Sequence, residues 1–251
     1  MSNEEIELTI VIPAYNEEKR IRKSLEKINS YLSGKDFASE VLVINDGSSD
    51  NTSSIVLNSK VFNLRLIENE VNRGKGYSVK RGIMESKGNY IIFSDADLST
   101  PIEETDKILS ALQGDYEIAI GSRHIQGSEI KIKQPWYRHL MGRIFNLFVR
   151  IIAVPNVIDT QCGFKGFRRD CALCIFNEIV TFGYSFDVEV LYLAYKFGFK
   201  IKEVPVIWLD SPTSRINPFI DPLKMFLDVL KIRLKHRNKN FARDSVLNPV
   251  R

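Results

Sequence analysis

Short apolar segments alternate with helical segments along the first half of the chain. The apolar runs are rich in β-branched residues, as buried strands are, and they lie at residues 7–12, 40–44, 64–67, 90–94 and 117–120. The segments between them have helical spacing or helix-start signals, and they lie at residues 17–32, 53–60, 76–86 and 102–112. This alternation predicts an α/β fold with a mostly parallel central sheet and helices on both faces.

The second half of the chain follows a different order. Helical spacing predicts helices at residues 136–154, 170–180, 186–197 and 222–237. A further strand is expected at residues 201–208, and the glycine- and phenylalanine-rich residues 163–167 are expected to form a loop. We see no linker or repeat and expect one unit, with a main domain over residues 1–221. Residues 222–251 would extend it with an amphipathic basic helix and a polar tail.

Composition narrows the class of protein. Of the 251 residues, 44% are hydrophobic and 26% are charged, which is ordinary for a soluble globular protein and excludes a disordered or collagen-like chain. The net charge of +4 is too small to indicate a nucleic-acid partner. The three cysteines form no disulfide or zinc pattern, and no segment resembles a signal peptide or a membrane span. We therefore expect a cytoplasmic protein with reduced thiols.

Polar clusters follow four of the predicted strands, at residues 15–17, 45–47, 95–97 and 121–123. Ligands of parallel α/β sheets bind at the carboxyl ends of the strands, so these clusters are expected to share one site. Asp95 and Asp97 are separated by Ala96 where a strand leaves the sheet, and such hard oxygen ligands suit Mg²⁺ or Mn²⁺. Taken alone, the two aspartates are more simply explained as caps of the next helix.

The other clusters suit a nucleotide. Tyr15, Glu17 and Asp46 follow two earlier strands, where an acidic group can bind ribose hydroxyls or a base edge. Arg123, after the fifth predicted strand, has the geometry to bind a phosphate with two hydrogen bonds. Each residue alone is explained as a cap, a turn or a surface ion pair. Together with the aspartates they indicate a site for a nucleoside diphosphate and a divalent metal.

These residues lie in motifs that resemble a known family. The motifs VIPAYNE, VINDGSSDNT, NRGKG and DAD lie at residues 11–17, 43–52, 72–76 and 95–97. They look like those of the family-2 nucleotide-sugar glycosyltransferases of GT-A fold. Further motifs resemble the polyprenyl-phosphate sugar synthases, and they lie at residues 121–123, 159–168, 186–189, 204–206 and 211–215. Within that group the chain is most similar to the dolichyl-phosphate glucosyltransferases, followed by the mannosyltransferases, over residues 7 to 230 or so.

The resemblance implies a role for individual residues. It assigns the nucleoside to Pro13, Tyr15, Glu17 and Asp46. It assigns the ribose, the diphosphate and the metal to Asp95, Ala96 and Asp97, with Asp97 as the direct metal ligand. Arg123 and Arg215 would hold phosphate.

The same resemblance names candidates for catalysis and one departure. If a general base is used, Asp187 is the first candidate and Asp159 the second, although Asp187 is equally explained as a helix cap. The mannosyl enzymes often have glutamine two residues after the second aspartate, where this chain has Ser99, a poorer metal ligand.

The expected function is an inverting transfer of glucose from UDP-glucose to a polyprenyl or dolichyl phosphate at the cytosolic face of a membrane. The alternatives are transfer from GDP-mannose, transfer to a surface polysaccharide, and nucleotide-sugar binding without turnover. A homo-oligomer or a membrane-protein partner is also compatible with the resemblance. The sequence argues against a dehydrogenase, because the glycine-rich dinucleotide-binding turn does not follow the first strand.

Two helical segments suggest how such a protein reaches a lipid. Residues 136–152 mix tryptophan, phenylalanine and leucine with arginine, as interfacial helices do, and residues 222–237 have a similar composition. Seven basic residues stand between Lys224 and Arg243, against the single acid Asp228. This pattern predicts contact with an anionic membrane surface. The alternative is that both helices pack on the core or on a second subunit.

Overall fold

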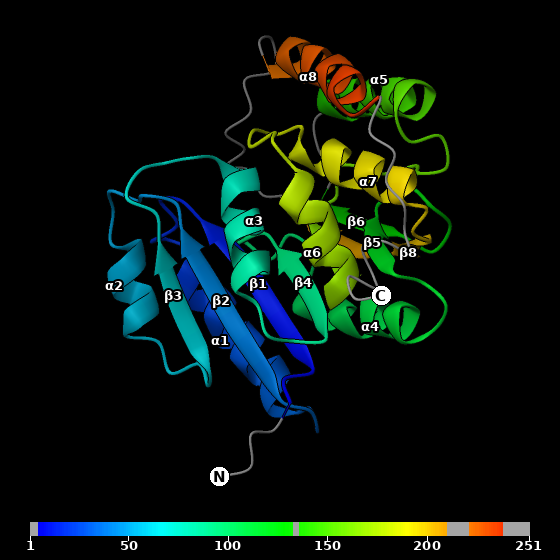
Figure 1. Ribbon diagram of the computed structural model, residues 1–251. Coiled ribbons are helices and arrows are strands. Elements are labelled where there is room, and N and C mark those ends of the chain that lie inside the picture. The colour runs from blue at the N-terminus through cyan, green and yellow to red at the C-terminus, as the bar shows by residue number, and fades with distance from the viewer. Residues whose placement is uncertain (1–4, 133–135, 210–220, 238–251) are drawn as a thin grey trace, which may run out of the picture.

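A computed structural model describes residues 5–132, 136–209 and 221–237. Its central sheet has seven strands in the order β3-β2-β1-β4-β7-β5-β8 (Figure 1). These are β1 (Leu8–Ala14), β2 (Ser39–Asn45), β3 (Leu64–Glu68), β4 (Tyr90–Ser94), β5 (Ile118–Ser122), β7 (Phe164–Arg168) and β8 (Ile201–Pro205). All neighbours are parallel except β7, which is antiparallel to both β4 and β5. The predicted mostly parallel sheet is confirmed.

Helices cover both faces of this sheet, as predicted. On one face lie α1 (Ile21–Ser33), α2 (Thr52–Leu57), the 3₁₀ turn η1 (Ile102–Glu104) and α4 (Thr105–Gln113). On the other face lie α3 (Lys75–Glu85), α6 (Arg169–Glu178) and α7 (Phe186–Phe197). Successive residues of β1 show why two cores form: Val11 packs in one cluster and Ile10 and Ile12 in the other, because side chains alternate across a strand.

Two more helices lie together beyond α7, at the top of the view in Figure 1. They are α5 (Trp136–Ile152) and α8 (Asp221–His236). The ring of Phe226 on α8 packs edge-on against Phe145 and Phe148 of α5, with centroids 5.6 and 4.6 Å away. Val229 and Ile232 of α8 are buried in the core shared with α7. The predicted C-terminal helix therefore packs on the main domain, while residues 238–251 lie outside the described residues.

Three expectations about local structure are corrected. Residues 163–167 were expected to be a loop, but Phe164–Arg168 form β7 in the middle of the sheet. The strand is formed by its neighbours: Phe164 and Phe167 fill opposite cores, and Gly166 leaves room for α4, since a Cβ there would lie 2.3 Å from Ile108.

The other two corrections concern element boundaries. The strand expected at residues 201–208 is two strands, β8 and β9 (Ile207–Leu209), and β9 pairs in a separate sheet with β6 (Glu129–Ile132). The helix expected from residue 17 begins at Ile21, because Arg20 before it has a non-helical φ of −121°. The backbone N–H groups of Glu17 and Glu18 donate to Thr52 and Asp50.

Candidate active site

The candidate site lies where β1 and β4 separate at the carboxyl end of the sheet. β1 pairs with β2 as far as Ala14 and Asn45, but its pairing with β4 ends at Val11 and Phe93. Pro13, which has no N–H group for a strand ladder, lies just beyond that point. The chain runs outward from β1 to β3 and returns to β4 on the other side of β1. Such a reversal of strand order is where ligands bind in open α/β sheets.

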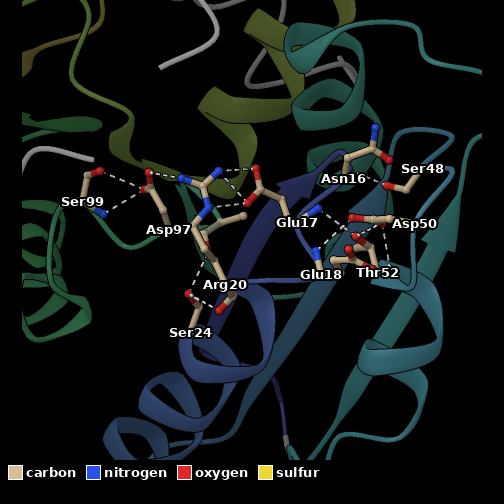
Figure 2. A network of polar contacts seen from close by, with 11 residues as sticks. Asn16, Glu17, Glu18, Arg20, Ser24, Ser48, Asp50, Thr52, Asp97 and Ser99 are labelled. Atoms are coloured by element: carbon tan, nitrogen blue, oxygen red, sulfur yellow. Dashed lines mark hydrogen bonds and ion pairs between the residues drawn. The ribbon is translucent and has the colours of Figure 1, made fainter. Parts of the chain in front are cut away.

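An arginine links the polar residues that follow these two strands. Arg20 donates from Nε and Nη2 to the two carboxylate oxygens of Glu17, both at 2.7 Å, and from Nη1 to Asp97 Oδ2 at 3.3 Å (Figure 2). Because Glu17 and Asp97 come from different loops, this bridge brings together two residues predicted to bind nucleoside and metal.

The Asp95–Asp97 turn is held from two sides. Ser24 of α1 donates from its hydroxyl to the carbonyl of Ala96 at 2.6 Å, so Ala96 takes part through its backbone. Ser99 donates from its N–H at 3.0 Å and its hydroxyl at 2.8 Å to Asp97 Oδ1. Ser99 thus orients the carboxylate of Asp97.

A second set of contacts joins the loops after β1 and β2. The backbone N–H of Asn16 donates to the Ser48 hydroxyl at 2.8 Å, and Asn16 Oδ1 accepts from the N–H of Ser49 at 2.8 Å. Asn16 has a φ of 52°, in the left-handed region that asparagine tolerates better than most residues. Tyr15, next to it, is exposed, so its ring is accessible beside a fixed backbone.

Asp46, expected to bind the nucleoside, shapes a loop in the structure. Its Oδ1 accepts hydrogen bonds from Asn69 Nδ2 at 2.7 Å and from the backbone N–H of Arg73 at 3.0 Å. Its Oδ2 accepts from the N–H of Gly74 at 2.8 Å. Asp46 is buried, so it fixes the start of α3 and the position of Lys75.

Lys75 supplies a second cation to the candidate site, in addition to Arg20. Its ammonium forms an ion pair with Asp95 Oδ1. Burial acts to lower the pKa of Lys75. The charges of Asp95 and Asp187 outweigh that effect, with a smaller contribution from Asp97, and raise the pKa above its usual value. The ammonium of Lys75 thus pairs directly with Asp95, and the charges of Asp187 and Asp97 act on it as well.

Gly163 lies directly against Asp95. A Cβ at this glycine would lie 2.1 Å from Asp95 Oδ2, which is far inside van der Waals contact. Only glycine lets the chain approach this carboxylate so closely. Asp95 is thus held between the Lys75 ammonium and the backbone that leads into β7.

Asp187 is at the start of α7 and belongs to a buried ion pair. Its Oδ1 accepts a hydrogen bond of 2.6 Å from Lys165 Nζ, which also donates to the carbonyl oxygen of Cys162 at 2.5 Å. The side chain of Lys165 has no exposed area, and that of Asp187 is 6% exposed. Buried charges of this kind persist only when they are paired. Lys165 therefore orients the first candidate base from the middle of the sheet.

Arg123 and Asp159 are paired with each other. Asp159 accepts from Arg123 Nε at 2.7 Å, from Nη2 at 2.8 Å and from its backbone N–H at 2.9 Å. Burial acts to raise the pKa of Asp159, but the charge and hydrogen bonds of Arg123 outweigh it and hold the pKa well below its usual range. A carboxylate held in this way is a weak base, which argues against Asp159 as the base. Arg215 lies outside the described residues.

Three residues of the candidate site were not assigned from the sequence: Arg20, Lys75 and Lys165. Arg20 stands three residues after Glu17, and Lys75 stands in the NRGKG motif, so both had a local signal. Lys165 also lies in a family motif, at residues 159–168, but its glycine-rich surroundings are typical of a loop and give no sign that it is buried.

The donor set fits a divalent cation that is shared with a phosphate. Among the described residues, no group of three or more histidine, cysteine, aspartate or glutamate side chains could hold a metal ion alone. Mg²⁺ commonly takes one or two carboxylates and completes its shell with substrate phosphate oxygens and water. Asp95 and Asp97 supply two carboxylates, and each already faces a cation, Lys75 or Arg20.

Comparison with known proteins gives a consistent result. The family described as Glycosyl transferase family 2 matches residues 9–176. A dolichyl-phosphate beta-glucosyltransferase of Dictyostelium discoideum is 35% identical, over 92% of this chain and 75% of its own. One of Homo sapiens is 36% identical, over 92% of this chain and 76% of its own.

A solved structure shares the fold at lower identity. It is glucosyl-3-phosphoglycerate synthase from Mycobacterium tuberculosis in complex with Mn²⁺, UDP-glucose and phosphoglyceric acid. It matches with a TM-score of 0.68 and 19% identity, over 92% of this chain and 79% of that one. The predicted resemblance is therefore confirmed: the chain belongs to glycosyl transferase family 2 and has a GT-A fold.

Proposed function

We propose that this glycosyltransferase moves glucose from UDP-glucose to dolichyl phosphate or a related polyprenyl phosphate, with inversion at the sugar carbon. The observation that carries this proposal is the pairing of Asp95 with Lys75 and of Asp97 with Arg20 at the reversal of strand order. The names of the relatives, which are 35% and 36% identical, support the sugar and the acceptor.

The divalent ion, Mg²⁺ or Mn²⁺, would be held by Asp97 and Asp95. When bound, it neutralises charge on the leaving diphosphate. The chain's own residues prepare this site, because Arg20 and Ser99 orient Asp97 while Lys75 and Gly163 hold Asp95. Tyr15 and Glu17, beside them on the loop after β1, are proposed to contact the nucleoside.

The acceptor requires little activation. A phosphate monoester has a second pKa of about 6, so it is mostly a dianion at neutral pH and is itself a nucleophile. Asp187 is proposed to face the acceptor, with its carboxylate oriented by Lys165. A single displacement at the sugar carbon would then invert its configuration. Arg123 and Arg215, which are predicted to hold phosphate, would position the nucleophile.

A lipid acceptor requires contact with a bilayer, and the outer surface of α5 and α8 suits this. No helix in the described part of the chain is long and apolar enough to cross a membrane. Instead, each of the two helices carries an exposed apolar stripe with spacings of three and four residues. We call the two stripes the α5–α8 face, and its residues are Ile144, Leu147, Ile151, Leu227, Leu230 and Leu234.

Basic residues surround this face. Arg143 and Arg150 flank the stripe of α5, and Lys224, Lys231 and Lys235 flank that of α8, all of them exposed. Apolar residues that enter the headgroup region and cations that attract anionic lipids are the two components of interfacial binding. We propose that the α5–α8 face lies on the cytosolic surface of a membrane.

The test is a donor panel with the purified protein, Mn²⁺ and a short polyprenyl phosphate. UDP release with labelled glucose in the organic phase is expected. GDP release with mannose would keep the site and change the donor, and nucleotide release without lipid label would move the acceptor to a soluble glycan. Nucleotide binding with no turnover under any condition would overturn the proposal.

A further inference from the structure

A pocket of about 490 Å³ lies between the C-terminal ends of α5, α7 and α8. Three cations line it: Lys196 from α7, and Arg233 and Arg237 from α8. Tyr192 and Tyr195 of α7 contribute two phenol groups. Among the described residues that line the pocket, none is acidic. Its chemistry therefore matches an anion that accepts several hydrogen bonds.

Two of these cations are held in place by backbone carbonyl groups at helix ends. Arg233 Nη1 donates to the carbonyl oxygen of Ile152 at the end of α5. Lys196 Nζ donates to the carbonyl oxygen of Arg237 at 3.4 Å. Carbonyl groups are dipoles without net charge, so these bonds position the cations and leave their charge in the pocket. A guanidinium has five N–H donors, so one such bond leaves donors for a ligand.

The pocket opens at the edge of the α5–α8 face. Ile151 and Leu234, which are 72% and 70% exposed, belong both to that face and to the pocket lining. A free phosphate ion would make no use of these two side chains. A phospholipid would, because its phosphate could bind the cations while its acyl chains follow the apolar stripes.

The pocket is separate from the reacting centre. Asp187 is in the first turn of α7 and Tyr195 is near its C-terminal end, eight residues further on. At a rise of 1.5 Å per residue, they stand about 12 Å apart along the helix axis. A phosphate bound among Arg233, Arg237 and Lys196 would therefore not be the phosphate that receives the sugar.

We propose that this pocket binds the headgroup of an anionic membrane phospholipid and so anchors the enzyme on its membrane in one orientation. The proposal rests on the membrane contact proposed above, but it adds a defined site to what would otherwise be diffuse attraction. The difference is measurable, because diffuse attraction depends on the number of charges and a site depends on their positions.

The test compares two double variants of α8 with equal loss of charge. Arg233→Gln/Arg237→Gln removes two pocket cations, and Lys224→Gln/Lys235→Gln removes two exposed cations of the same helix outside the pocket lining. Binding is measured by co-sedimentation with vesicles of phosphatidylcholine alone or with about 20% phosphatidylserine at fixed ionic strength. We expect the pocket variant to bind the anionic vesicles about tenfold more weakly than the matched control. Equal weakening of the two variants would overturn the proposal.

Further arms separate the remaining explanations. Arg233→Lys keeps the charge and a donor for the carbonyl group of Ile152. Arg237→Gln can also be compared alone with Lys235→Gln. With these single variants, a folding defect in the double variant would not hide the result. If inorganic phosphate raises the melting temperature of the wild type only, while the vesicle affinities of pocket and control variants match, a free anion is the ligand and the lipid assignment is wrong.

The outcome also separates this proposal from the proposed function. Failure of the wild-type protein to bind any vesicle would overturn both the membrane contact and the pocket ligand. Position-dependent vesicle binding in a protein that transfers no glucose would support the pocket ligand and overturn the transfer reaction.

Discussion

The residues after β1, β2 and β4 differ from the layer formed by α5 and α8 in how their charges are used. At the sheet edge, Glu17, Asp97 and Asp95 are partnered by Arg20 and Lys75 within hydrogen-bond distance. On α5 and α8, basic residues and leucines are exposed side by side. The first arrangement holds groups in place for a small ligand, and the second suits an extended surface. The candidate site thus has paired charges, whereas the charges of the α5–α8 face are exposed.

The largest effect is expected from breaking the buried Lys165–Asp187 pair of the candidate site. Lys165→Met leaves Asp187 buried without its partner, which should lower the free energy of unfolding by about 3–5 kcal/mol. Urea unfolding measures this. As a control, Lys231→Met breaks an ion pair with Asp228 in which the lysine side chain is 75% exposed, and should cost less than about 1 kcal/mol. Equal effects would mean that Lys165 does not support the site in the way its burial indicates.

Asp97→Ala should then remove most of the activity while the fold persists. We expect a loss of glucosyl transfer of about a thousandfold, because the carboxylate is proposed to hold the ion that stabilises the leaving group. Initial rates of UDP release with and without EDTA check it. The matched control is Asp106→Ala, at an exposed aspartate of α4 that pairs with Lys35. Substantial EDTA-resistant activity in Asp97→Ala would contradict the metal assignment.

The Arg123–Asp159 pair should make stability depend on pH. The pKa of Asp159 is depressed in the folded protein, so its contribution is present above the unfolded pKa of about 4 and is lost as the pH falls below it. We expect Asp159→Asn to cost about 3 kcal/mol at neutral pH and progressively less below about pH 4. Unfolding curves of both proteins across that range measure the difference. A cost that does not change with pH would show that the charge of Asp159 is not what matters.

A smaller effect is expected from one methyl group near Asp95. Gly163→Ala places its Cβ against the Asp95 carboxylate and must displace it, so activity should fall by about 10- to 100-fold. Gly183→Ala is a sharp control, since a Cβ there would meet nothing within 4 Å. If the two alanine variants have the same activity, the position of the Asp95 carboxylate is less critical for activity than its contacts with Lys75 and Gly163 imply.

The smallest effect on stability is expected from substitutions on the α5–α8 face. Leu227→Gln/Leu234→Gln replaces two exposed leucines, so the free energy of unfolding should change by less than about 1 kcal/mol. Vesicle binding should nevertheless weaken about tenfold, because apolar area no longer enters the interface. Leu57→Gln, an exposed leucine at the end of α2, should leave binding unchanged. If analytical ultracentrifugation instead shows that the double variant disrupts a dimer, a second subunit covers this face.

Much of the candidate site could be predicted from the sequence, because most of its residues directly follow the ends of strands. Strand ends are marked by a change from apolar to polar residues, and β1, β2, β4 and β5 end within two residues of their predicted positions. Since parallel strands present their carboxyl ends at one edge, residues 15–17, 46 and 95–97 could be grouped without coordinates. The predicted roles of these residues remain predictions, while the grouping of their loops is what the structure describes.

The chain by itself determined the alternation of strands and helices, the family motifs and the polar edge of the sheet, because each depends on residues close in sequence. Only the tertiary structure decided that β7 enters the sheet between β4 and β5, that Lys165 faces Asp187, and that Asp159 is bound by Arg123. These pairs join residues 22 and 36 positions apart. Their stability comes from burial, which removes water as a competing partner and is a property of the packed molecule.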